Sequence, residues 1–220
     1  MSEIVAIDGP AGSGKSSVSK QVARELGFGY LDTGAAYRAL AWAVLQGDFE
    51  LANLAEVDLD ASFDYAISLD ADDFWVRVGV HDVTAAIREQ QVAEFVSQVA
   101  RIQTVRDFMK RLTHRLVAQS GRAGVVVEGR DITTVVAPDA KIRLLLTASE
   151  EVRLKRRSAE LSPQAAAEVH KQVSQRDQSD SKVVDFITPA PGVTLVDSTD
   201  LNFVQTVAAV RELIERALGR

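Results

Sequence analysis

A glycine-rich stretch near the start of the chain, GPAGSGKS from Gly9 to Ser16, combines residue types that suit phosphate binding. It fits the pattern G-x-x-x-x-G-K-[ST], which about 1% of chains of this length would contain by chance at ordinary residue frequencies. Glycines let consecutive backbone N–H groups point inward without side-chain clashes. Lys15 would add a full positive charge at the terminal phosphates, and the hydroxyl of Ser16 could ligate Mg²⁺. The predicted ATP-binding residues are Gly9, Pro10, Ala11, Gly12, Ser13, Gly14, Lys15, Ser16 and Ser17.

The segments on either side of this stretch are those that a phosphate-binding loop needs. Ile4–Ile7 is a fully apolar run, which predicts a buried parallel strand. Val18, Val22 and Leu26 recur every four residues and predict a helix that Gly27 ends. The N-terminus of that helix would direct its positive dipole end at the phosphates.

Two acidic residues are candidates for holding Mg²⁺ through water. Glu128 ends an apolar strand, Val125–Val127, and so resembles the magnesium-holding acid of phosphate-loop proteins. Asp8 ends the first strand and is the alternative, unless it is only a turn residue. The sequence leaves this choice open.

The remaining chain alternates apolar runs with helical patterns, which predicts an α/β fold: a three-layer sandwich with a five-stranded parallel sheet. Thr33 could cap the second helix, and Ser149 could begin a later one. Residues 58–84 instead alternate apolar and polar side chains, which favours a small antiparallel β insert. Met109 and the phenylalanines on nearby helix faces are expected in the core. The strands expected besides the two already named are Tyr30–Leu31, Ile142–Leu146 and Val193–Val196.

Composition and charge exclude several classes of protein. The chain of 220 residues has no cysteine, so it has neither disulfides nor thiolate chemistry. Its net charge of −6 argues against generic binding to nucleic acid or to an anionic membrane. No apolar run could span a bilayer, and the N-terminus lacks the pattern of a signal peptide, so a cytoplasmic protein is expected. The three histidines show no spacing for metal or base chemistry and are expected at the surface: His81, His114 and His170.

Four segments together resemble the bacterial cytidylate kinases, which are P-loop nucleoside monophosphate kinases. They are LDTGAAYRALA from Leu31, the long segment VVVEGRDITTVVAPDAKIRLLLTASEEVRLKRRSAEL from Val125, QRDQSDS from Gln175, and GVTLVDST from Gly192. The resemblance covers nearly the whole chain, including the antiparallel insert that sets this family apart. Adenylate kinases share the glycine loop but lack the G-R-D segment in this setting.

The resemblance implies a site for the phosphate of an acceptor nucleotide. In the family, that phosphate is gripped by the arginines of three motifs, which correspond here to Arg38, Arg130 and Arg176. Thr33 and Tyr37 line the same pocket. Taken one at a time, such residues also fit helix surfaces, and only the joint pattern carries the assignment.

The resemblance also implies a site for the cytosine base. Its edge is read by Ser97, Arg106 and Asp131, while Asp180 faces the sugar and Arg88 lies nearby with a less certain role. Cytosine offers an amino donor and two acceptors, so an arginine with a carboxylate or hydroxyl matches it, whereas uracil would not match.

The chain departs from the family pattern at one position. The family continues R-D-x-x-D-S-x-R, but Val183 stands where the last arginine belongs. Lys182 could reach in its place, or the missing charge could come from Arg153, Arg156 or Arg157. The predicted catalytic residues are Lys15, Arg130, Arg176 and Lys182.

The activity that the resemblance implies is Mg²⁺-dependent transfer of the γ-phosphoryl group of ATP to CMP or dCMP. The expected layout is a single kinase domain, acting as a monomer, with a core of residues 1–34, 101–152 and 184–220. A nucleotide-binding lobe of residues 35–100 and a lid of residues 153–183 would close over the substrates. The alternatives are a kinase for another small acceptor, such as uridylate or shikimate, and an ATP-gated binding module.

Overall fold

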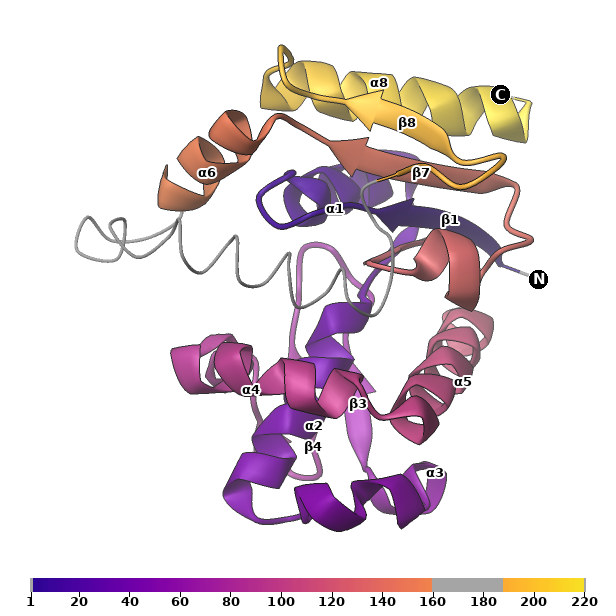
Figure 1. Ribbon diagram of the computed structural model, residues 1–220. Coiled ribbons are helices and arrows are strands. Elements are labelled where there is room, and N and C mark those ends of the chain that lie inside the picture. The colour runs from indigo at the N-terminus through magenta and orange to yellow at the C-terminus, as the bar shows by residue number, and fades with distance from the viewer. Residues whose placement is uncertain (1, 160–187, 220) are drawn as a thin grey trace. The chain divides into compact units, whose positions relative to one another are not determined.

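The computed structural model describes residues 2–159 and 188–219 and divides into two compact units (Figure 1). Unit 1 comprises Met1–Tyr30 and Arg122–Arg220, and unit 2 comprises Leu31–Gly121. Unit 2 is therefore one continuous stretch of chain inserted into unit 1. None of the helices within the described ranges is long and apolar enough to cross a membrane.

Unit 1 is built on a five-stranded sheet. Its order is β2-β6-β1-β7-β8, so the first strand lies at the centre. β1 pairs in parallel with β6 and with β7, and β7 pairs in parallel with β8. The strands are β1 (Glu3–Asp8), β2 (Gly29–Asp32), β6 (Gly124–Gly129), β7 (Ile142–Thr147) and β8 (Thr194–Asp197), all close to the predicted runs.

The central strands are apolar throughout because both of their faces are buried. Val5, Ala6 and Ile7 have no exposed surface, and neither do Val125–Val127 on the neighbouring strand. A half-exposed strand would alternate apolar and polar residues instead. The predicted fold class, an α/β fold with a parallel five-stranded sheet, is confirmed.

The described helices of unit 1 begin and end at recognisable signals. α1 ends at Gly27, whose φ of 67° is left-handed, and α8 begins with a capping box in which Asn202 and Gln205 exchange hydrogen bonds. α1 and α8 pack against each other. The helices are α1 (Lys15–Leu26), a π-helical turn η3 (Ile132–Val136), α6 (Glu150–Ala159) and α8 (Phe203–Leu218).

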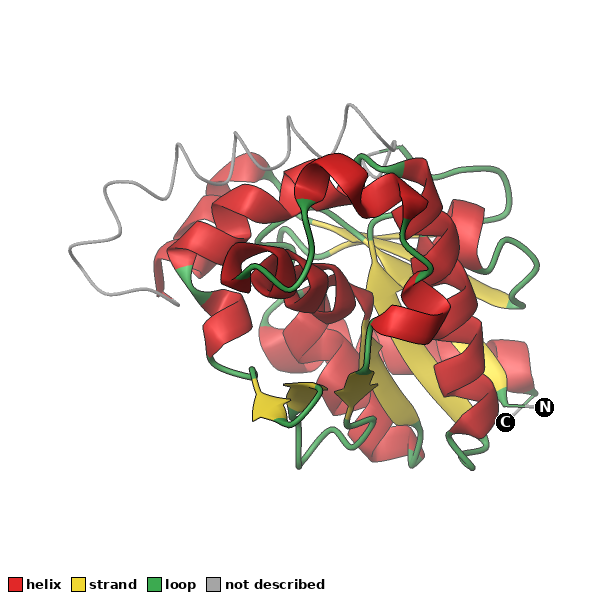
Figure 2. Cartoon of the chain, turned by 90° about the horizontal axis from the view of Figure 1, so that it is seen from below, coloured by secondary structure: helices red, strands yellow, loops and turns green. Residues whose placement is uncertain are grey.

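Unit 2 is mainly helical and carries the predicted antiparallel insert. Its three short strands form a separate sheet in the order β3-β4-β5 (Figure 2, yellow). The elements are α2 (Thr33–Gln46), η1 (Leu51–Glu56), α3 (Leu59–Ser62), β3 (Tyr65–Ile67), β4 (Val76–Val78), β5 (His81–Asp82), η2 (Ala86–Arg88), α4 (Gln90–Ala100) and α5 (Gln103–Gln119).

One predicted helix cap in unit 2 is wrong by a residue. The side chain of Asp32, rather than that of Thr33, caps α2 by accepting a hydrogen bond of 3.0 Å from the N–H of Ala35. The carboxylate lies outside the helix, where it can reach back to the exposed first turn, whereas Thr33 is already the first helical residue.

The core of unit 2 joins helices to the insert through aromatic rings. Phe63 stacks on Tyr65 at a centroid distance of 5.6 Å and meets Phe108 of α5 edge-on at 6.1 Å. Met109 is buried as expected, and the two described histidines, His81 and His114, are exposed. α5 packs on α2, α3 and α4, all within unit 2, although the sequence-based layout placed residues from 101 onward in the core.

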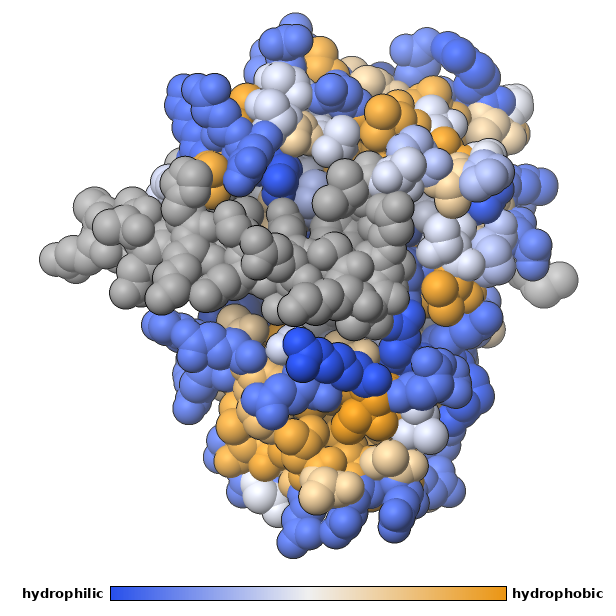
Figure 3. Space-filling model, viewed as in Figure 1, coloured by the Kyte–Doolittle hydropathy of each residue, from blue (hydrophilic) through white to orange (hydrophobic). Residues whose placement is uncertain are grey.

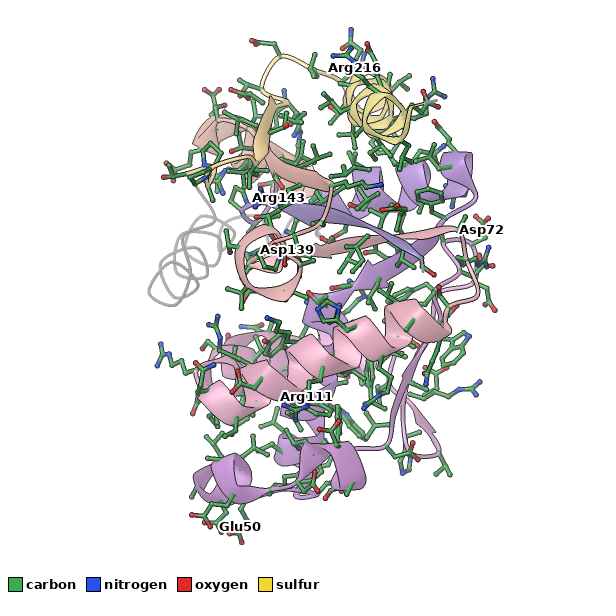
Figure 4. The ribbon with its side chains drawn as sticks, turned by 90° about the vertical axis from the view of Figure 1, so that its right-hand side faces the viewer. Glu50, Asp72, Arg111, Asp139, Arg143 and Arg216 are labelled. Carbon is green, nitrogen blue, oxygen red and sulfur yellow. The ribbon has the colours of Figure 1, made fainter. Side chains whose placement is uncertain are left out.

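Charged side chains make specific contacts on the surface of unit 2. Arg111 lies on the side of α5 that faces α3, where it binds Asp60 at 2.6 Å, and Arg115 binds the other oxygen at 2.9 Å (Figure 4). These two guanidinium groups lower the pKa of the Asp60 carboxyl. Figure 3 shows hydrophilic residues over much of the described surface and a group of hydrophobic residues in the lower half of the view.

Candidate active site

The loop between β1 and α1 has a backbone that requires glycine at several positions. Gly12 and Gly14 have φ angles of 75° and 87°, in the left-handed region. A Cβ on Gly9 would lie 2.2 Å from the backbone oxygen of Leu146, and one on Gly12 would lie 2.5 Å from that of Arg153. The glycines are therefore fixed by close neighbours as well as by their dihedral angles.

The loop leads directly into the N-terminus of α1. Gly14 is the N-cap residue, and because it has no side chain the helix begins without a side-chain cap. Uncapped N–H groups and the helix dipole together favour an anion at this point. Ser16 and Ser17, in the first turn, are exposed. The geometry thus suits the predicted phosphate site.

Four cationic side chains bind four carbonyl groups of the loop. Arg130 donates to the oxygen of Gly9 at 2.8 Å, and Lys15 donates to that of Pro10 at 3.4 Å. Two arginines of α6 continue the series: Arg153 donates to the oxygen of Ala11 at 2.9 Å, and Arg156 donates to that of Ser13 at 3.2 Å. The loop is therefore surrounded by positive charge, although the whole chain is acidic.

The two acids considered for magnesium have different surroundings. Both carboxylate oxygens of buried Asp8 accept hydrogen bonds from η3: Oδ1 from the N–H of Ile132 at 2.9 Å, and Oδ2 from the N–H and hydroxyl of Thr133 at 2.8 and 2.6 Å. Burial raises the pKa of the Asp8 carboxyl, against the lowering effect of these hydrogen bonds and of Lys15. Asp8 therefore anchors η3 to the end of β1.

Glu128 lies at the end of β6, the strand next to β1, and is also buried. Its Oε1 accepts a hydrogen bond of 2.7 Å from the hydroxyl of Tyr30. The described residues contain no group of three acidic, histidine or cysteine side chains that could hold a metal ion. A single carboxylate with the hydroxyl of Ser16 suits Mg²⁺, which prefers few protein ligands and substrate phosphates.

The acceptor residues predicted in unit 2 lie on elements that pack together. Arg38 is on α2, Ser97 on α4 and Arg106 on α5, and these three helices contact one another. Arg38 binds the N-cap residue Asp32 at 2.7 Å, and both side chains are about nine-tenths buried, at 12% and 10% exposure. Thr33 and Tyr37 share α2 with Arg38, and exposed Arg88 lies 5.8 Å from the ring centre of Phe74.

The other predicted acceptor residues fall outside unit 2 or outside the described residues. Arg130 and Asp131 follow β6 in unit 1, immediately before η3. The predictions for the later segment lie beyond what the structure describes: Arg176, Asp180, Lys182 and Val183, with His170 and the side chain of Arg157.

Sequence reasoning missed the role of the DST segment, Asp197 to Thr199. Ser198 is fully buried, and its N–H and hydroxyl both donate to the oxygen of Thr147. The hydroxyl of Thr199 accepts a hydrogen bond of 2.8 Å from the N–H of Ser149 at the start of α6. The segment therefore joins the end of β8 to α6. The signal in the sequence that could have indicated this role is the pair of small hydroxyl residues directly after a strand.

The central strand, the glycine loop and the helix that follows define a phosphate-loop kinase fold. A crystal structure of TT1252 from Thermus thermophilus has the same fold, with a TM-score of 0.52, 18% identity and coverage of 98% of both chains.

The comparison with known sequences is more specific. Residues 5–216 match the family model described as cytidylate kinase. The chain is 45% identical over 214 residues to the cytidylate kinase of Cutibacterium acnes, covering 96% of this chain and 95% of that protein. It is 38% identical over 221 residues to that of Mycobacterium leprae, with coverages of 98% and 97%. The chain belongs to the cytidylate kinase family.

Proposed function

We propose that this chain transfers the γ-phosphoryl group of ATP to the phosphate of CMP or dCMP, which gives ADP and CDP or dCDP. The observation that supports this most directly is the glycine loop, whose backbone geometry, helix N-terminus and surrounding cations suit a triphosphate. Membership of the cytidylate kinase family supports the choice of acceptor. In this proposal Lys15 and the loop N–H groups hold the phosphates of ATP.

The acceptor is already a phosphate oxyanion, so the reaction needs no strong general base. Its difficulty is to bring two groups of like charge into line, which countercharge and positioning achieve. In this proposal Arg38, Arg130 and Arg176 bind the acceptor phosphate. Arg38 would either give up its contact with Asp32 or bind both groups at once. Lys182 would compensate for Val183. Thr33 and Tyr37 complete this phosphate pocket in the proposal.

The base would be read by Ser97, Arg106 and Asp131, with Asp180 at the sugar. Of these, Ser97 and Arg106 are half-buried on neighbouring helices of unit 2. Two side chains of this kind can match the donor and acceptors of cytosine. The selectivity for cytosine over uracil follows, because uracil would leave a buried polar group unpaired.

The proposal includes Mg²⁺, held by Ser16, Glu128 through water, and the phosphates of ATP. When bound, the ion would neutralise phosphate charge as it does in other phosphoryl-transfer enzymes. Glu128 is preferred over Asp8 because hydrogen bonds from Ile132 and Thr133 already bind both oxygens of Asp8. We further propose that the protein is cytoplasmic and monomeric. Light scattering during size-exclusion chromatography would measure the oligomeric state.

A coupled assay of ADP release over a panel of nucleoside monophosphates tests the proposal. We expect turnover with CMP and dCMP and a much lower kcat/KM with UMP and AMP. A preference for UMP, or turnover with shikimate alone, would assign another acceptor. ATP binding without turnover on any acceptor would instead favour a binding module.

Replacement of Lys15 by alanine tests the phosphate site itself. We expect kcat/KM to fall by about 10²–10³-fold, because one charge-stabilising group at the reacting phosphates has this effect in other enzymes. The matched control is Lys141→Ala, which removes an exposed lysine whose Nζ lies 3.4 Å from a carboxylate oxygen of Glu3. Wild-type turnover in Lys15→Ala would refute the assignment.

A further inference from the structure

We infer that Arg153 and Arg156 of α6 are positioning residues, which hold the phosphate-binding loop by its carbonyl groups and thereby preset the N–H groups that face the phosphates. This inference rests on the proposed function, because it presumes that the loop binds ATP. Figure 1 shows α6 beside the loop between β1 and α1, all within unit 1.

The two arginines bind carbonyl groups that are two residues apart in the loop. Arg153 donates to the oxygen of Ala11 at 2.9 Å, and Arg156 donates to the oxygen of Ser13 at 3.2 Å. The backbone of α6 also comes close to the loop, since the oxygen of Arg153 lies 2.5 Å from the position that a Cβ of Gly12 would take. The helix therefore encloses the loop on one side.

The geometry of the peptide group links these carbonyl contacts to the direction of the loop N–H groups. In a trans peptide the C=O of one residue and the N–H of the next point in opposite directions. Binding the oxygen of Ala11 therefore turns the N–H of Gly12 away from Arg153, and binding that of Ser13 turns the N–H of Gly14 away from Arg156. Gly12 and Gly14 are the two loop glycines with left-handed φ. A charged donor also polarises the peptide, which strengthens its N–H as a donor.

Arg156 is further anchored on its other side. Its guanidinium donates to the hydroxyl of Ser198 at 2.9 Å, to the oxygen of Ser198 at 2.8 Å and to that of Leu201 at 3.2 Å. Ser198 is fully buried and is itself fixed by its hydroxyl, which donates to Thr147. One side chain thus ties the loop to the segment that follows β8.

This anchoring also bears on the missing family arginine. To reach a transferring phosphate, Arg156 would have to give up hydrogen bonds to three carbonyl groups and a hydroxyl. The geometry therefore assigns Arg156 to the support of the loop, and not to the replacement of the arginine absent at position 183.

The experiment compares Arg156→Lys and Arg153→Lys with the wild type and with Arg143→Lys as a matched control. Arg143 also donates to two carbonyl groups, those of Thr133 and Pro191, but none is in the loop. A lysine keeps the charge but cannot span several acceptors. Calorimetry gives the Kd for MgATP, steady-state kinetics give KM and kcat, and hydrogen exchange of the ligand-free protein reports on the amides of residues 9–16.

We expect Arg156→Lys to raise the Kd and KM for MgATP about tenfold, with kcat at saturating ATP within about threefold of the wild type. The loop amides should exchange faster in the ligand-free variant. Arg153→Lys should show the same effects, because it also removes one contact with the loop. It tests the inference independently if Arg156→Lys does not fold. Arg143→Lys should leave the Kd and the exchange of the loop unchanged.

The inference is overturned if the arginine variants bind MgATP and exchange their loop amides as the wild type does. It is also overturned if kcat falls more than about tenfold while the Kd stays constant, because that pattern marks a contact made only in the transition state. Failure of the wild type to bind MgATP would refute the proposed function instead, and the exchange data would still decide whether these arginines order the loop.

Discussion

At the scale of single residues, the buried hydroxyls of two tyrosines show how differently such a group can be accommodated. The hydroxyl of Tyr30 donates to the buried carboxylate of Glu128 at 2.7 Å. The hydroxyl of Tyr65, on the insert, is buried and has no hydrogen-bond partner within residues 2–159 and 188–219. Burial raises the pKa of Tyr65 well above its ordinary value, and the negative charge of Asp32 adds to this effect.

This difference predicts different results for the same substitution at the two positions. Tyr30→Phe should lower the free energy of unfolding by about 1–3 kcal/mol, because Glu128 loses a donor while it stays buried. Tyr65→Phe should change it by less than about 1 kcal/mol, or stabilise the protein, because no hydrogen bond is lost. Urea unfolding of the two variants measures both values. An equal loss in both would mean that the hydroxyl of Tyr65 has a partner.

The raised pKa of Tyr65 also predicts a dependence of stability on alkaline pH. Above about pH 10 the side chain loses its proton in the unfolded chain but keeps it in the folded one. The unfolded state then binds fewer protons, so the free energy of unfolding falls as the pH rises towards the folded pKa. Tyr65→Phe lacks this contribution. Its stability should therefore decline less than that of the wild type between about pH 9 and 10.5.

At the scale of elements, β8, α6 and the glycine loop form one connected support. The hydroxyl of Thr199 donates to Asp197 at 2.6 Å and accepts from the N–H of Ser149, which links the end of β8 to the start of α6. The same contact with Thr199 lowers the pKa of the Asp197 carboxyl. The loop is thus held by a strand, a turn and a helix, and a change in any of them should disturb it.

The contact between the loop and β7 gives a prediction at this scale. Gly9→Ala should weaken ATP binding at least about tenfold and lower stability, because its Cβ would lie 2.2 Å from the backbone oxygen of Leu146 and β1 or β7 must shift. Gly47→Ala is the control: Gly47 has a left-handed φ of 88° but open space around it. The control should lose about 1 kcal/mol of stability with unchanged ATP binding.

The elements were predictable where one local signal decides them. Ile4–Ile7 is apolar at every position because β1 is buried on both faces, and the glycine loop follows from its own spacing. The contacts of Arg153 and Arg156 were not predictable, because they join α6 to a loop more than a hundred residues earlier. Periodicity carries no information on such pairings, and both arginines fit a phosphate contact equally well.

At the scale of the whole molecule, binding of ATP to the folded state alone should stabilise the protein. At an ATP concentration of 100 times the Kd, the free energy of unfolding should increase by about 2.7 kcal/mol. Thermal unfolding with MgATP measures this. Arg156→Lys should need about tenfold more ATP for an equal shift, whereas Arg216→Ala, on the outer side of α8 (Figure 4), should behave as the wild type. An ATP-independent melting temperature would count against nucleotide binding by the glycine loop.

The order of the strands has a consequence for folding during synthesis of the chain. β1 leaves the ribosome before the other strands of its sheet, yet its partners are β6 and β7, and Ala6 pairs with Val127. Unit 2 is synthesised in between and can collapse on its own contacts first. Until residues 124–147 emerge, the apolar strand that carries the future glycine loop stays exposed. While it lacks these partners, this strand is an apolar segment that chaperones would need to shield.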